Sequence, residues 1–173
     1  TVKVACLALS RIANFDDLDP LKMEPGLTVE MILPGRPIPA DAALVIVPGT
    51  KSTRGDLAFL RAQGWDIDLL AHHRRGGRVL GICGGYQMLG SYYRTWDGKQ
   101  CDFIGAIDYY TVGAKERMIG NTLFECLPES GGSTVVGFEN HSGKTYLGSG
   151  VSPLGKMLVG GGNNGEDGFD PGG

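Results

Sequence analysis

Cys83 lies in a sequence context that could make it a nucleophile. An apolar run precedes it, residues 81–85 read Gly-Ile-Cys-Gly-Gly, and a helix-like stretch follows. A strand that turns sharply into a helix around a nucleophile needs neighbours without side chains, because the central residue takes a strained backbone conformation. Gly81, Gly84 and Gly85 meet that need. The pattern predicts a nucleophile elbow that presents the Cys83 sulfur at the C-terminal edge of a sheet.

The chemistry of such an elbow is attack of a thiolate on a carbonyl carbon. The positive end of the following helix favours the thiolate, and the Gly84 N–H can donate to the developing oxyanion. A second donor is expected from residues 48–52, Pro-Gly-Thr-Lys-Ser, where the Gly49 or Thr50 N–H would face the Cys83 sulfur region. The competing interpretation is a buried cysteine beside a glycine-rich turn, which the elbow pattern makes the less favoured of the two.

The other cysteines have no comparable glycine frame. Cys6, Cys101 and Cys126 lie in or beside strand patterns and are expected to be small core residues. His72 and His73 end a predicted helix beside two arginines, where a solvated role is expected. Because the chain has neither C-x-x-C spacing nor a paired-histidine motif, no metal site is predicted.

The elements that must position the elbow alternate along the first half of the chain. Strands are predicted at residues 2–9, 27–33, 43–47 and 78–82, with loops at residues 11–25 and 34–39. A capping-box pattern from Thr53 to Asp56 predicts the start of a helix. The helical spacing of apolar residues is interrupted at Gly64 and ends at the glycines at residues 76–77. Another helix is predicted at residues 84–93. This alternation predicts an α/β fold with a mainly parallel, flavodoxin-like sheet and flanking helices.

The pattern changes after residue 100. Short strands are predicted at residues 104–112, 122–126, 133–138, 144–147 and 156–159, separated by turn residues and without a long helix. They predict an antiparallel β extension in the C-terminal half. A length of 173 residues suits one domain, residues 1–173.

Composition excludes several classes of function. Hydrophobic residues make up 42% of the chain and charged residues 20%, with a net charge of −3, which is typical of a globular domain. This balance indicates no nucleic-acid partner, and the apolar runs are too short for membrane insertion. No signal peptide is recognisable, so a cytoplasmic location with reduced thiols is expected.

The first half resembles the class I glutamine amidotransferases, in the branch of cobyric acid synthase. Residues 81–90 are similar to that family's elbow, and residues 47–53 and 56–61 to its strand-end loop and helix. Residues 11–21, Arg-Ile-Ala-Asn-Phe-Asp-Asp-Leu-Asp-Pro-Leu, resemble the segment that opens the glutaminase domain of this branch. The resemblance covers residues 1 to about 90.

The second half resembles a different member of the same family, the glutaminase subunit of lipid II isoglutaminyl synthase. The similarity rests on residues 105–111, 117–121, 137–146 and 162–168. Both halves therefore imply one fold and one half-reaction, but different acceptors: cobyrinate a,c-diamide in cobalamin biosynthesis, or the D-glutamate of lipid II in peptidoglycan biosynthesis. A chimaeric, designed or divergent sequence would each explain the change.

The resemblance implies roles for particular residues. Cys83 would be the nucleophile that forms a thioester with L-glutamine, Gln87 would help to hold the substrate with Thr50, and Arg117 would contact it or shape its pocket. Ammonia would pass to an ATP-dependent synthetase domain or subunit. The chain has no Walker-type phosphate loop, so no cofactor is expected in this domain, and ATP and Mg²⁺ are expected on the synthetase.

The general base is the open question of the sequence. A thioester mechanism needs a histidine to shuttle protons, and in the resembled family it follows the region of residues 162–168 in a Gly-Thr-Tyr-Leu-His-Gly-like turn. The sequence reaches residue 173 without that turn, so a truncated domain with little turnover is expected. His141 is the possible general base within the chain, but a structural hydrogen-bonding role is favoured for it. The alternative function is a non-catalytic amidotransferase-like binding module.

Overall fold

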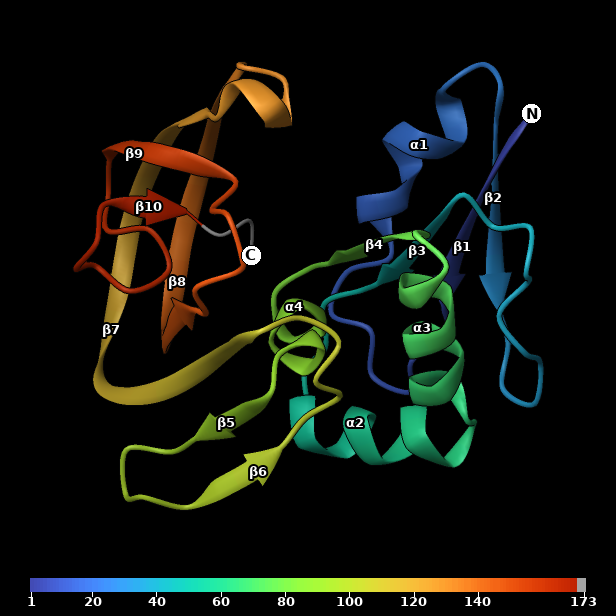
Figure 1. Cartoon of the computed structure of the whole chain (residues 1–173), viewed down its shortest axis with the longest axis horizontal. Coiled ribbons are helices and arrows are strands. Elements are labelled where there is room, and N and C mark those ends of the chain that lie inside the picture. The colour runs from blue at the N-terminus through green and yellow to red at the C-terminus, as the bar shows by residue number, and fades with distance from the viewer. Residues whose placement is uncertain (171–173) are drawn as a thin grey trace. The chain divides into compact units, whose positions relative to one another are not determined.

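The computed structural model describes residues 1–170 as two compact units, one of residues Thr1–Leu89 and one that begins at Gly90 (Figure 1). Each unit has its own sheet. None of the helices among residues 1–170 is long and apolar enough to cross a membrane. That the two units act as one domain, as the sequence indicates, stays a prediction.

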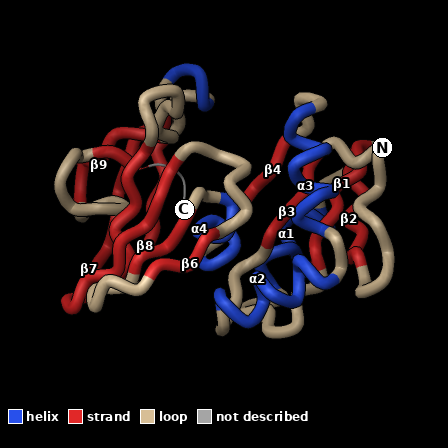
Figure 2. The backbone as a smooth tube through the Cα atoms, turned by 60° about the horizontal axis from the view of Figure 1, so that its bottom comes forward, coloured by secondary structure: helices blue, strands red, loops and turns tan. Residues whose placement is uncertain are grey.

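The first unit is built on a parallel sheet. Strands β1 (Val2–Leu7), β2 (Leu27–Ile32), β3 (Leu44–Val47) and β4 (Arg78–Gly81) pair in the order β2-β1-β3-β4. That order matches the beginning of the flavodoxin-like arrangement, 2-1-3-4. Figure 2 shows helices beside these strands. The predicted α/β fold with a mainly parallel sheet is therefore confirmed.

The central strands β1 and β3 are buried on both faces, which explains why they are nearly continuous apolar runs. On one face Val4, Cys6 and Ile46 form a core cluster with Leu18. The alternate positions of the same strands, on the opposite face, are also buried. Strands covered on both sides hold their ends firmly, and the ends of β1 and β3 lie beside the site described below.

Two helices follow β3. Helix α2 spans Thr53–Ala62 and α3 spans Trp65–Arg74, and Gly64 between them has a φ of 74°. The helix start and the break were predicted correctly, but the capping box was not. Ser52 is the N-cap residue and makes no side-chain capping bond, and the Asp56 carboxylate accepts hydrogen bonds from Ser10 and Thr50.

The segment at residues 11–25 is not wholly loop, as the sequence suggested. A 3-10 turn at Asp16–Leu18 leads into the short helix α1 at Asp19–Met23, with a proline in its first turn. Proline is tolerated there because the first N–H groups of a helix have no intrahelical partner. The turn buries Leu18 against the sheet core.

Helix α4 spans Gly84–Leu89, four residues shorter than predicted. A Cβ atom on Gly90 would lie 2.6 Å from the Tyr109 ring, and the Ser91 N–H donates to the Tyr109 carbonyl. The chain leaves the helix here because it pairs with a neighbouring strand instead. It continues as strand β5 at Tyr92–Arg94.

The second unit is almost entirely strand and loop (Figure 2). Beside β5 it contains β6 (Gln100–Asp102), β7 (Tyr109–Cys126), β8 (Thr134–Leu147), β9 (Gly155–Val159) and β10 (Phe169–Asp170), with a 3-10 turn at Pro128–Ser130. All neighbouring pairs are antiparallel except β5 with β7. The antiparallel character was predicted, and the strands form a sheet of their own.

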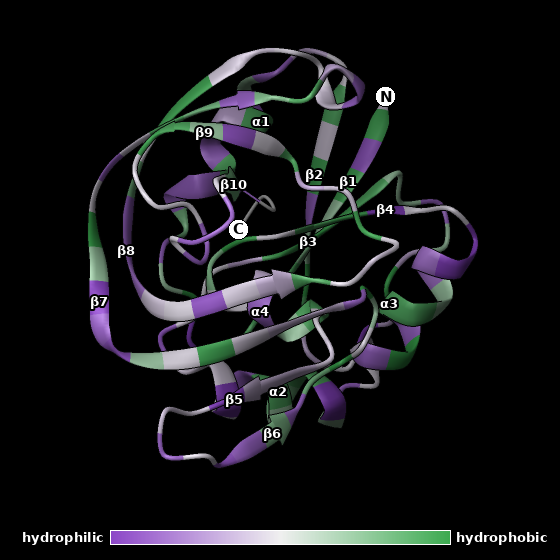
Figure 3. Ribbon diagram, turned by 60° about the vertical axis from the view of Figure 1, so that its left-hand side comes forward, coloured by the Kyte–Doolittle hydropathy of each residue, from purple (hydrophilic) through white to green (hydrophobic). Residues whose placement is uncertain are grey.

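Two long strands replace four predicted short ones. The strands expected at residues 104–112 and 122–126 are parts of the 18-residue β7, and those expected at residues 133–138 and 144–147 are parts of the 14-residue β8. A register shift between Gly113 and Met118 interrupts their ladder. Both strands carry hydrophilic as well as hydrophobic residues along their length (Figure 3). Intervening glycine and polar residues had suggested turns, but cross-strand pairing overrides that local preference.

Candidate active site

Cys83 lies at the turn between β4 and α4 and is exposed. Its φ of 52° makes it the one non-glycine residue among residues 1–170 with a positive φ. The left-handed region costs a side-chain-bearing residue free energy, so such residues concentrate where the surrounding structure enforces them. The sharp turn expected of a nucleophile elbow is therefore present in the backbone.

The glycines around Cys83 are required by close packing. A Cβ atom on Gly81 would lie 2.5 Å from the Tyr86 Cα atom, and one on Gly85 would lie 2.1 Å from the Val47 carbonyl oxygen. One on Gly84 would lie 2.7 Å from the Thr50 Cγ2 atom. A side chain at Gly81 or Gly85 would displace backbone and one at Gly84 would displace threonine side chains, so the three glycines let the elbow pack closely.

The loop after β3 lies beside the elbow, as predicted from the position of both segments at the ends of parallel strands. A Cβ atom on Gly49 would be 3.6 Å from the Cys83 Cβ atom and 3.7 Å from that of Ala13. The C-terminal ends of β1, β3 and β4 thus meet here, next to the β1–β3 position where the strand order reverses. Ligands of open α/β sheets bind at such a switch point.

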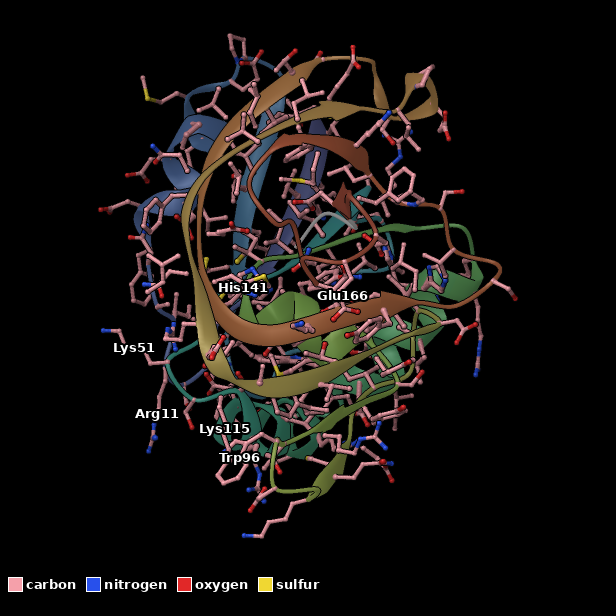
Figure 4. The ribbon with its side chains drawn as sticks, turned by 90° about the vertical axis from the view of Figure 1, so that its left-hand side faces the viewer. Arg11, Lys51, Trp96, Lys115, His141 and Glu166 are labelled. Atoms are coloured by element: carbon pink, nitrogen blue, oxygen red, sulfur yellow. The ribbon has the colours of Figure 1, made fainter. Side chains whose placement is uncertain are left out.

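The loops after β1 and β3 are joined by a short antiparallel bridge between Ile12 and Thr50. The Ala13 N–H donates to the Gly49 carbonyl at 2.8 Å, and the Lys51 N–H donates to the Arg11 carbonyl at 3.0 Å. In Figure 4 the Arg11 and Lys51 side chains extend outward from this bridge. The bridge fixes the backbone that faces the elbow.

Two predicted substrate contacts lie in this unit. Thr50 is buried, and its hydroxyl donates to the Asp56 carboxylate and accepts the Ser52 N–H. That hydroxyl is already engaged within the protein, and a contact of Thr50 with substrate stays a prediction. Gln87 is half-buried on α4, one turn beyond Cys83, with its N–H donating to the Cys83 carbonyl at 3.1 Å.

The remaining cysteines differ in burial. Cys6 and Cys126 are buried, as predicted, and burial raises the pKa of the Cys6 thiol to about 12. Cys101 is not a core residue, because it lies half-exposed on the short edge strand β6. Exposure therefore distinguishes Cys83 from the two buried thiols, and Cys101 is its natural comparison.

The prediction that His72 is solvated is wrong. His72 is buried, and its Nε2 atom lies 3.0 Å from the Arg78 carbonyl, to which it donates. Gly77 makes this possible, because a Cβ atom there would lie 2.3 Å from the imidazole. His73 is exposed, as expected.

Arg117 and His141 belong to the second unit. The exposed Arg117 guanidinium donates to the side-chain and backbone oxygens of Asn140 across β7 and β8. The His141 Nδ1–H donates to the Gly143 carbonyl at 2.8 Å, and its Nε2 atom lies 3.9 Å from a carboxylate oxygen of Glu139. Both ring nitrogens thus face oxygen atoms of the same strand.

Sequence reasoning missed the most connected side chain of this region, Asp56. It was taken as part of a capping box, but its fully buried carboxylate accepts four hydrogen bonds from Ser10, Arg11 and Thr50. Its partner at position 10 is 46 residues away in sequence. The one available signal was an aspartate between apolar positions of an amphipathic helix.

Comparison with known proteins yields one family. The model described as CobB/CobQ-like glutamine amidotransferase domain matches residues 3–172. Cobyric acid synthase of Cereibacter sphaeroides is 60% identical over 147 residues, which are 82% of this chain and 30% of that protein. Cobyric acid synthase of Bradyrhizobium diazoefficiens is 51% identical over 160 residues, 90% of this chain and 33% of that protein. The chain thus spans about a third of the length of these curated relatives.

Solved structures agree on the fold. A crystal structure of glutamine amidotransferase has a TM-score of 0.66 at 18% identity and covers 88% of this chain and 79% of its own. A glutamine amidotransferase from Thermotoga maritima has a TM-score of 0.60 at 16% identity, covering 92% of this chain and 68% of its own. At such identities the likeness concerns the fold alone.

Proposed function

The chain belongs to the CobB/CobQ-like glutamine amidotransferase family, and from this premise we propose that it hydrolyses L-glutamine through a thioester on Cys83. The family match confirms the enzyme class expected from the sequence. One observation carries the assignment of the nucleophile: an exposed cysteine with a φ of 52° at a strand-to-helix turn. A free thiol with no chemical role would gain nothing from this strained backbone.

The reaction has two halves. The Cys83 thiolate attacks the side-chain carboxamide carbon of glutamine, and the tetrahedral intermediate expels ammonia to leave a γ-glutamyl thioester. Water then attacks the thioester, which releases glutamate and restores the thiol. The sum is glutamine and water giving glutamate and ammonia.

The oxyanion would be stabilised by backbone donors. We assign the Gly84 N–H and an N–H of the Gly49–Thr50 segment to this role, because that loop packs against the elbow: a Cβ atom on Gly49 would lie 3.6 Å from the Cys83 Cβ atom. Removing one such donor costs about 10²–10³-fold in rate in a known hydrolase. Gln87, one helical turn beyond Cys83, would hold the amino acid end of the substrate.

Both half-reactions also need a proton carrier. A general acid protonates the leaving ammonia, and a base activates the water, which contributes about 10²–10⁴-fold. His141 is a candidate within this chain, although its Nε2 atom faces a carboxylate at 3.9 Å. Arg117, on the adjacent strand of the same ladder, is proposed to contact the substrate or shape its pocket.

The ammonia would serve an ATP-dependent synthetase in the cytoplasm. The chain itself has no phosphate-binding loop, so ATP and Mg²⁺ would act on that partner. The relatives described above are named cobyric acid synthase and match 82–90% of this chain, both halves included. They favour cobyrinate a,c-diamide as the acceptor over the D-glutamate of lipid II.

A non-catalytic binding module is the alternative, and chemical labelling separates the two. A glutamine-analogue electrophile such as 6-diazo-5-oxo-norleucine should label Cys83 in preference to the half-exposed Cys101, with adducts located by mass spectrometry. Glutamate release, alone and with a synthetase, is measured in parallel. Equal labelling of all four cysteines in the folded protein would exclude Cys83 as a specific nucleophile, and specific labelling without glutamate release would favour the binding module.

A further inference from the structure

The buried carboxylate of Asp56 lies behind the loop that faces the elbow. Its Oδ1 atom accepts the N–H of Ser10 at 3.1 Å and the Ser10 hydroxyl, and its Oδ2 atom accepts the N–H of Arg11 at 3.2 Å and the Thr50 hydroxyl. Two loops and a helix therefore meet on one side chain. A fully buried carboxylate is costly unless such donors replace its lost water.

These bonds fix the conformation of Thr50. Its hydroxyl is held by Asp56, so its methyl group must lie on the other side of the Cβ atom, and there it contacts the elbow. The Thr50 Cγ2 atom would be 2.7 Å from a Cβ atom on Gly84. One branch of the threonine is thus anchored in the interior, and the other covers the first residue after the nucleophile.

The same carboxylate also holds the loop after β1. By accepting the N–H groups of Ser10 and Arg11, it fixes the start of the segment at residues 11–13. That segment pairs with residues 49–51 through the Ala13 and Lys51 N–H groups. The Gly49–Thr50 backbone is consequently held from both sides, by Asp56 and by the bridge to residues 11–13.

We propose that Asp56 is a positioning residue for the glutaminase reaction: it sets the Gly49–Thr50 segment at the distance from Cys83 that oxyanion stabilisation requires. The inference rests on the proposed function. Asp56 touches neither Cys83 nor the substrate, and acts through Thr50 and the bridge. Misplacing such donors by a fraction of an ångström weakens their interaction with the transition state, because oxyanion stabilisation depends on preorganised geometry.

Asp56→Asn is the informative variant because it keeps the shape and changes one acceptor into a donor. An Nδ2H₂ group in place of Oδ2 would face the Arg11 N–H and leave it without an acceptor, while the Thr50 hydroxyl would lose its anionic acceptor. Asp68→Asn is the matched control. Asp68 is a half-buried carboxylate on α3 that holds another loop through the Ile38 N–H at 3.0 Å.

The measurement compares two reagents on Cys83. A glutamine analogue with a chloroketone in place of the carboxamide presents a carbonyl to the oxyanion site, whereas iodoacetamide alkylates the sulfur by direct displacement without an oxyanion. In Asp56→Asn we expect the chloroketone rate to fall about tenfold or more and the iodoacetamide rate to change less than about threefold. Asp68→Asn should keep the wild-type ratio of the two rates.

The outcomes separate the two proposals. If the chloroketone labels wild-type Cys83 no faster than Cys101, the proposed function itself fails. If wild-type labelling is specific but Asp56→Asn keeps the wild-type ratio, the positioning role alone is overturned. Should Asp56→Asn not fold by circular dichroism, Ser10→Ala decides: it removes one hydroxyl donor at the exposed side, and an unchanged ratio there overturns the positioning role.

Discussion

The two units of this chain carry their candidate functional residues in different ways. In the first unit, the relevant atoms lie at the C-terminal ends of parallel strands, and 20 of the 24 buried hydrophobic residues of residues 1–170 belong to it. The other four lie in the second unit: Phe103, Tyr109, Phe124 and Cys126. Its long strands expose large apolar residues such as Ile119, Val136 and Phe138.

The difference shows what fixes a site. Cys83 and Gly49 are positioned by the ends of a parallel sheet and by glycines in close contact with neighbouring residues. Arg117 and His141 are positioned by one antiparallel ladder, through bonds to Asn140 and Gly143 on that same ladder. Lys115 over Trp96, 4.6 Å from the ring centroid, is a further surface contact within the second unit (Figure 4). Precise chemistry is therefore expected to depend more on the first unit than on the second.

The largest effect is expected at Cys83. Cys83→Ala should lower the glutaminase rate by about six orders of magnitude, as removal of the nucleophile does in a well-studied hydrolase. Cys101→Ala, in the second unit, should leave the rate at the wild-type value. Glutamate release with the synthetase present measures both. If Cys83→Ala retained the wild-type rate, Cys83 would not be the nucleophile of the reaction.

Core substitutions should separate the units by stability. Leu60 is 0% exposed and Val136 is 79% exposed. Leu60→Ala should lower the free energy of unfolding by about 2–5 kcal/mol, whereas Val136→Ala should stay within about 0.5 kcal/mol. Urea titration followed by circular dichroism measures both, and Trp65 fluorescence in a Trp96→Phe background reports the first unit alone. Equal losses would mean that Val136 is covered in the folded protein.

Burial of Cys6 should make the first unit sensitive to alkaline pH. The unfolded thiol loses its proton near pH 8.5, while the folded pKa is raised to about 12 by burial. Above pH 8.5 the unfolded state thus binds fewer protons, and stability falls by up to about 1.4 kcal/mol per pH unit. Cys6→Ala should show a shallower decline between pH 9 and 10.5 in urea titrations. Parallel curves would indicate that the Cys6 thiol has the same pKa in the folded and the unfolded state.

The smallest effect is expected at His141. Because its Nδ1–H is bound to Gly143 and its Nε2 atom faces Glu139, His141→Ala should change the chloroketone labelling rate of Cys83 less than about threefold. A general base would instead be worth about 10²–10⁴-fold in glutamate release. Both rates are measured on the same variant, with His73→Ala, an exposed histidine of the first unit, as the control. A loss of glutamate release in that range would identify His141 as the base.

Much of the first unit follows from its sequence alone. The four parallel strands, the helix break at Gly64 and the elbow at Cys83 are all encoded locally, by apolar runs and by glycines at positions that need them. Such signals act within about ten residues, so one sequence carries them in readable form. The adjacency of the Gly49 loop and the elbow also followed, because carboxyl ends of parallel strands share one edge.

Only the tertiary structure decided the remaining features. The burial of His72 depends on the space left by Gly77, the end of α4 on the pairing of Ser91 with Tyr109, and the length of β7 on the ladder that β8 supplies. Asp56 shows the reason most clearly. Its partners are 6 to 46 residues away, and a carboxylate that could cap its own helix binds them instead because a buried charge takes the donors that folding brings to it.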